Sequence, residues 1–183
     1  KTLSAADREW LESVDLNQVV TGTLDSLCEQ ALSQHRAPGR QPPVMIDTYL
    51  SNTVLVRQGL FPGRLHDDAD LDTWLLSLRN DAKFGWNLGA KRGLLMSLWD
   101  RLHQDQVSMG ALPKAGLPSG VDISVQAVLG NYRQYLTDNG WLDFAMLGDE
   151  TLSQLRAGYL DGWVNAFQVV LVDEYQDSNL LQE

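Results

Sequence analysis

Two adjacent acids, Asp173 and Glu174, follow a run of four aliphatic residues near the end of the 183-residue chain. Such a run (Val169–Val172) predicts a buried strand, and in open α/β sheets ligands bind beyond the carboxyl ends of the strands. One carboxylate could then hold a divalent cation while the other activates a water molecule. The alternative is a strand-to-helix turn without chemistry, in which Asp177 or Ser178 caps the next helix.

The residues around this pair extend the pattern. Superfamily I DNA helicases of the UvrD/PcrA/Rep type carry a motif II that is similar to the stretch Val172-Asp173-Glu174-Tyr175-Gln176-Asp177-Ser178-Asn179. The resemblance implies that Asp173 helps to hold Mg²⁺ and that Glu174 is the base that activates the water attacking ATP. It also implies that Gln176 lies near the γ-phosphate and links the nucleotide to the DNA-binding elements.

A second stretch, Val19–Cys28, looks like the family's Gly-Thr-Phe-His-Ser-Leu-Cys segment, in which a strand turns into a helix that touches single-stranded DNA. Thr23 and Ser26 match this segment, so the resemblance implies that they contact nucleic acid. Leu24 and Asp25 stand where the family has an aromatic residue and a histidine. Because a carboxylate repels phosphate, Asp25 either caps the following helix or weakens a DNA contact.

A third similarity joins Tyr132–Leu136 and Leu142–Phe144 to the segment by which the family returns from an inserted helical subdomain to the nucleotide-binding core. Ala145 and Met146 replace two acids there, and we expect these residues to pack rather than to catalyse. The chain contains no Gly-x-x-x-x-Gly-Lys-Ser/Thr phosphate loop, which the family carries further upstream. We therefore expect a piece of a longer enzyme that is inactive alone.

The expected fold class is α/β and mostly helical: a partial RecA-like P-loop NTPase core that contributes two strand segments, with an inserted α-helical subdomain. Proline and glycine between Ala37 and Pro43 predict a break. We accordingly expect residues 1–37 and 141–183 to belong to the core and residues 38–140 to form the insertion.

Individual elements follow from apolar periodicity and capping residues. Strands are expected over Asn17–Thr21 and from Phe167 onward. The helices expected along the chain cover approximately residues 7–14, 26–35, 49–59, 70–83, 91–106, 122–139 and 150–160.

The net charge of −10 has the wrong sign for a general nucleic-acid binder. Bases nevertheless cluster in the predicted insertion, at Arg79, Lys83, Lys91, Arg92 and Arg101. This cluster is either a solvated helix face or, as the resemblance suggests, a surface for DNA. Trp86, in a glycine-flanked connector, is the tryptophan that we expect to stack on a base, although tryptophans at helical spacing usually pack in the core.

Other residue types exclude several classes of protein. Cys28 is the only cysteine, so no internal disulfide can form, and its apolar surroundings predict a core position. The scattered histidines do not predict structural zinc. No apolar run reaches the roughly 20 residues of a membrane-spanning helix, and we expect no membrane partner and a cytoplasmic location.

The resemblance as a whole implies an ATP-dependent DNA helicase that uses ATP and Mg²⁺ in DNA repair or replication. Its partners would be single-stranded and junction DNA, together with the remaining helicase domains of the same chain. Two alternatives stay open: a non-enzymatic helical interaction module, and the motor lobe of a helicase-nuclease subunit.

Overall fold

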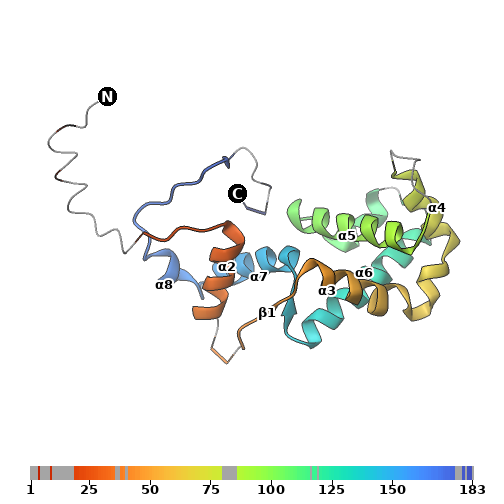
Figure 1. Ribbon diagram of the computed structural model, residues 1–183, viewed down its shortest axis with the longest axis horizontal. Coiled ribbons are helices and arrows are strands. Elements are labelled where there is room, and N and C mark those ends of the chain that lie inside the picture. The colour runs from red at the N-terminus through yellow and green to blue at the C-terminus, as the bar shows by residue number, and fades with distance from the viewer. Residues whose placement is uncertain are drawn as a thin grey trace.

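The computed structural model describes residues 4, 9, 19–35, 38, 39, 41–79, 86–115, 117, 118, 120–175, 179, 181 and 182. Helices dominate this part of the chain, which confirms the expectation of a mostly helical protein (Figure 1). None of the described helices is long and apolar enough to cross a membrane. The helix expected over residues 7–14 falls outside the described residues, apart from Glu9.

The elements run in the following order. They are α2 (Leu24–Gln34), β1 (Val44–Met45), α3 (Thr48–Val54), the π-helix η2 (Leu55–Leu60), the 3₁₀ helix η3 (Pro62–Asp67), α4 (Ala69–Ser77), α5 (Leu88–Gln104), the 3₁₀ helix η4 (Met109–Ala115), α6 (Val121–Asp138), β2 (Trp141–Leu142), α7 (Phe144–Arg156) and α8 (Asp161–Val164).

Short polar side chains begin five of these helices by accepting a hydrogen bond from a backbone N–H two or three residues further on. The capping residues are Thr23, Asp47, Asp68, Asn87 and Asp143. Because Thr23 caps α2, Asp25 is not the cap; it lies in the first turn, where a carboxylate favours the helix dipole. Asp143 likewise starts α7 at Phe144, six residues earlier than the expected start at Glu150.

Buried apolar side chains form two clusters. The larger cluster lies among α3, η2, α4, α5 and α6, and the smaller one lies chiefly between α2 and α7, which pack against each other (Figure 1). Cys28 belongs to the smaller cluster, which confirms its core position. The parallel strands β1 and β2 pair Val44 with Trp141 and Met45 with Leu142. They bring together two segments close to the predicted boundaries of the insertion, although the division into domains stays a prediction.

A buried carboxylate joins three helices at the centre of the molecule. Asp143, which is 4% exposed, accepts hydrogen bonds from Trp99 Nε1 at 2.8 Å, Tyr132 OH at 2.7 Å and the backbone N–H of Met146 at 2.8 Å. Burial and the neighbouring Asp143 raise the pKa of the Tyr132 phenol, so it stays a donor. These contacts confirm that the third family-like segment packs.

Neither expected strand forms among the residues that the structure describes. Val19–Thr21 and Phe167–Val172 have no strand hydrogen bonding. The side chains of Val169–Val172 are 61–92% exposed, and Val19 and Val20 are at least half exposed. A strand forms only when a neighbouring strand pairs with its backbone. No other described segment does so here, and the apolar run therefore lies open.

Candidate functional site

The two acids of the predicted site occupy a bend at the end of the exposed run Val169–Val172. Both side chains are exposed, and the backbone N–H of Glu174 donates to Asp173 Oδ1 at 2.9 Å. Glu174 has a φ of +51°, a left-handed conformation that costs a non-glycine residue about 1 kcal/mol. Gln176 lies outside the described residues.

Asp173 has the donor chemistry that Mg²⁺ requires. No group of three or more acidic, histidine or cysteine side chains in the described part of the chain could hold a metal ion. Magnesium, however, is usually held by one or two carboxylates together with phosphate oxygens and water. An exposed single carboxylate therefore fits a magnesium ion that arrives with its nucleotide, with Asp173 as the residue that would hold it.

Thr23 and Ser26 are joined by two hydrogen bonds across the first turn of α2. Ser26 N–H donates to Thr23 Oγ1 at 3.2 Å, and Ser26 Oγ donates to the Thr23 carbonyl at 2.8 Å. A Cβ atom at Gly22 would lie 2.5 Å from Ser26 Oγ, so a larger residue there would displace this hydroxyl. Capping alone explains these residue types, while both side chains are exposed at a helix N-terminus, where phosphate binds favourably. Their contact with DNA stays a prediction.

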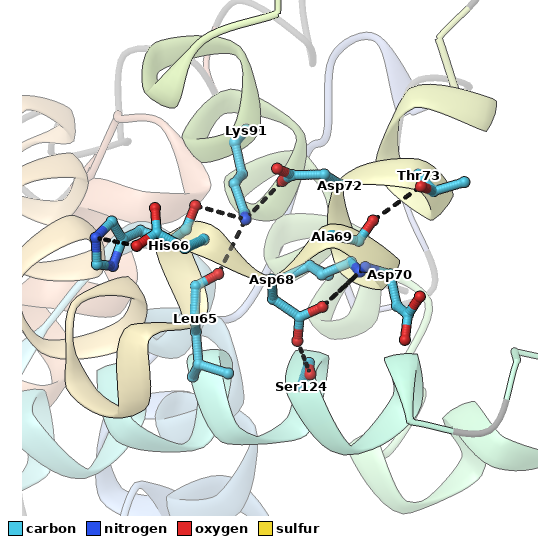
Figure 2. A network of polar contacts seen from close by, with 11 residues as sticks. Leu65, His66, Asp68, Ala69, Asp70, Asp72, Thr73, Lys91 and Ser124 are labelled. Carbon is cyan, nitrogen blue, oxygen red and sulfur yellow. Dashed lines mark hydrogen bonds and ion pairs between the residues drawn. The ribbon is translucent and has the colours of Figure 1, made fainter.

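Lys91 does not belong to an exposed basic face, and that expectation is wrong. Its side chain is 2% exposed and Nζ lies 2.6 Å from Asp72 Oδ1 (Figure 2). Nζ also donates to the carbonyls of Leu65 and His66, at 2.9 and 3.2 Å. Lys91 shares the inward face of α5 with Leu95 and Trp99, at spacings of four residues that place side chains on one face. It therefore fastens η3 and α4 to α5.

The other sequence-predicted nucleic-acid residues have varied surroundings. Arg79 and Arg92 are half-buried, and Lys83 lies outside the described residues. Arg101 is exposed and pairs with Asp105 at 2.7 Å. Trp86 is partly buried against the larger cluster, which favours packing over base stacking.

Replacing Lys91 by methionine should lower the free energy of unfolding by about 3 kcal/mol, because the buried side of Asp72 and two carbonyls lose their cation. The partial exposure of Asp72, 27%, keeps the loss at the low end for a broken buried pair. Urea unfolding followed by circular dichroism measures this. Arg57→Met, at an exposed position on η2, is the matched control and should change stability by less than about 0.5 kcal/mol. Equal stabilities of the two variants would contradict the fastening role.

A polar junction between α5 and α7 was not predicted. His103 Nδ1 contacts Asp149 Oδ2, and Gln106 Nε2 donates to Asp149 Oδ1 at 2.7 Å. The His103 ring, 4.2 Å from that of Trp99, lines a cavity of about 260 Å³ together with Arg133. None of the predicted site residues that the structure describes lines this cavity. In the polar junction, Asp149 lies more than 40 residues from His103 and Gln106 in the sequence, so no local pattern predicts these contacts.

The junction makes stability depend on pH. Burial would raise the pKa of Asp149, but hydrogen bonds from His103 and Gln106 outweigh it and lower the pKa below the ordinary value. A lowered carboxyl pKa adds stability that is complete above the unfolded pKa of about 4 and is lost as pH falls through the folded pKa. Asp149→Asn should therefore flatten the loss of stability below about pH 4.

Urea unfolding at a series of pH values from neutral to acid measures this effect. Asp138→Asn, at an exposed position, serves as the control and should leave the acid dependence as it is in the unaltered chain. An Asp149→Asn profile parallel to that of the unaltered chain would show that the junction contributes nothing to acid sensitivity.

Comparison with known proteins assigns the chain to a family. A sequence model described as the UvrD/REP helicase N-terminal domain matches residues 3–183. No curated protein and no solved structure matches. The matched range holds the two acids at the end of an apolar run, the hydroxyl-capped helix α2 and the helices between them. The chain belongs to the UvrD/REP helicase N-terminal domain family.

Proposed function

We propose that this chain is part of the first motor lobe of an ATP-dependent DNA helicase, which couples ATP hydrolysis to movement along single-stranded DNA and to unwinding at a junction. The observation that carries the proposal is the family match over residues 3–183, with Asp173 and Glu174 directly after an apolar run. Family membership supports a helicase in general; the assignment of chemistry to single residues is our inference.

The exposed apolar run supports a larger assembly. The four adjacent aliphatic side chains of Val169–Val172 are exposed to solvent. Burying each of them is worth about 1.5–3 kcal/mol, so the segment gains much by joining a sheet. In the complete protein, the run would pair with further strands of the nucleotide-binding core, and the acids would then lie at the carboxyl end of a buried strand.

At that position each acid has a distinct task. Glu174 would accept a proton from the water that attacks the γ-phosphate, and Gln176 would help to orient that water. Asp173 would hold Mg²⁺, which neutralises charge on the phosphate oxygens when it is bound. Thr23 and Ser26, at the N-terminus of α2, would bind the DNA backbone, and the family's inserted helices would approach the junction.

Phosphate release with Mg²⁺-ATP tests the proposal. The complete protein should hydrolyse ATP and should do so faster with single-stranded DNA. The 183-residue chain should release no phosphate above the blank, since its sequence has no phosphate loop. Phosphate release by the 183-residue chain would contradict the proposal. A complete protein that does not hydrolyse ATP would also contradict it and would favour a non-enzymatic interaction module.

A further inference from the structure

The turn that follows the two acids is closed by a reciprocal pair of hydrogen bonds. The backbone N–H of Asn179 donates to Gln182 Oε1 at 3.2 Å, and the backbone N–H of Gln182 donates to Asn179 Oδ1 at 3.1 Å. This arrangement is that of a capping box, in which each side chain satisfies the backbone N–H of the other residue. It closes a turn between Asn179 and Gln182, a few residues beyond Glu174.

Leu181 packs this turn against the junction between α5 and α7. We call its contacts with Gln104 and Gly148 the seat. Its backbone N–H donates to the carbonyl of Gln104, the last residue of α5, at 3.1 Å. Its side chain lies over Gly148 of α7, where an added Cβ would come within 2.6 Å of Leu181 Cδ2. The missing side chain of Gly148 therefore makes the space that Leu181 occupies.

Polar contacts join the two helices on which Leu181 lies. Asp149, the neighbour of Gly148, pairs with His103 and accepts from Gln106, so α7 is tied to the end of α5 beside the seat. By the predicted boundaries, α5 belongs to the helical insertion and α7 to the motor core. The turn after the acids thus contacts both of these parts at once.

We propose that Leu181 is a positioning residue for Asp173 and Glu174, and that its seat on Gly148 couples the helical insertion to the nucleotide site. A shift of α5 against α7 would move Leu181 and, because Asp173 and Glu174 lie only eight and seven residues before it in the chain, would displace the two acids. This inference rests on the proposed function. It adds a mechanical link between the insertion, which would lie near DNA, and the residues that would act on ATP.

Gly148→Ala tests the seat with little risk to the fold. Alanine favours the interior of a helix over glycine, so α7 gains intrinsic stability while the new methyl group collides with Leu181. Gly130→Ala is the matched control, because Gly130 lies inside α6 and a Cβ there meets nothing within 4 Å.

Amide hydrogen exchange on the 183-residue chain gives the first readout. The Leu181 amide should be protected, and Gly148→Ala should reduce its protection by about fivefold or more, as expected for the loss of one hydrogen bond. Gly130→Ala should leave it unchanged. An unprotected Leu181 amide in the unaltered chain, or equal protection in both variants, would overturn the proposal.

Steady-state hydrolysis by the complete helicase gives the second readout. Gly148→Ala should lower kcat for ATP about tenfold without changing KM, since misplaced catalytic groups act on the chemical step. Leu181→Ala should make a further Gly148→Ala change nearly silent, because the two residues act through one contact. Unchanged kcat in Gly148→Ala would overturn the positioning role if Glu174→Gln still abolishes hydrolysis. If Glu174→Gln has no effect, the proposed function itself fails.

Discussion

Glu174→Gln in the complete protein should lower kcat for ATP hydrolysis by about 10²–10⁴-fold, the usual contribution of a general base. Glutamine keeps the size and the hydrogen-bonding oxygen of the side chain but cannot take a proton from the attacking water. ATP binding should persist, because the phosphate loop and Asp173 are unchanged. Phosphate release in the presence of single-stranded DNA, together with binding of a fluorescent ATP analogue, separates the two effects.

Glu29→Gln is the control for this variant, since Glu29 is exposed on α2 and has no place in the proposed site. It should hydrolyse ATP at the rate of the unaltered protein. A Glu174→Gln protein that retains turnover within about twofold of the unaltered protein would remove Glu174 from the reaction. That result would favour a helical interaction module over a motor.

Asp143→Ala should lower the free energy of unfolding by about 4 kcal/mol, because it leaves two buried donors and a helix N-terminus without an acceptor. The two buried donors are Trp99 Nε1 and the hydroxyl of Tyr132, and the N-terminal group of α7 is the backbone N–H of Met146. Each unsatisfied buried group costs about 1–3 kcal/mol, and the lost cap adds about 1 kcal/mol. Urea unfolding of the 183-residue chain measures the loss.

Asp67→Ala is a suitable comparison because the Asp67 side chain is 70% exposed and pairs with His66 at 3.2 Å. Exposed pairs of this kind contribute less than about 1 kcal/mol. Asp143→Asn should fall between the two alanine variants, since the amide keeps one acceptor oxygen. If Asp143→Ala unfolds within about 1 kcal/mol of the unaltered chain, the carboxylate does not hold α5, α6 and α7 together.

The helices could be predicted because their signals are local. Apolar residues repeat every three to four positions in α5 and α6, and both helices lie within three residues of the expected starts and ends. The start of α7 was placed less well, because Asp143 caps this helix and it begins six residues before the expected Glu150. Helix α4 begins at Ala69, one residue before its expected start, because the carboxylate of Asp68 caps it by accepting from the backbone N–H groups of Asp70 and Leu71.

The strands and the polar contacts depend on distant residues. The run Val169–Val172 has the composition of a buried strand, but backbone pairing needs a neighbour that no described segment supplies. Lys91 was expected at the surface because its type is usually exposed. Its burial follows from Asp72 and from the carbonyls of Leu65 and His66, and periodicity within one helix cannot reveal such partners.

The candidate site, like the fold, could be predicted from the sequence only in part. The pattern of residues around Asp173 and Glu174 was enough to identify the family, which the match over residues 3–183 shows. The arrangement that would position these acids was not readable from sequence. We propose that it depends on the fit of Leu181 over Gly148, and a glycine inside a helix has no sequence signal that identifies its neighbour.

The central claim is that Val169–Val172 becomes a strand of a nucleotide-binding sheet and carries Asp173 and Glu174 at its end. Amide hydrogen exchange of these four residues, in the 183-residue chain and in the complete protein, tests it most directly. We predict rapid exchange in the chain alone, where the segment is exposed, and protection at least about 100-fold greater in the complete protein. Equally rapid exchange in both would contradict the claim, because the acids would then lack the buried strand on which their proposed chemistry depends.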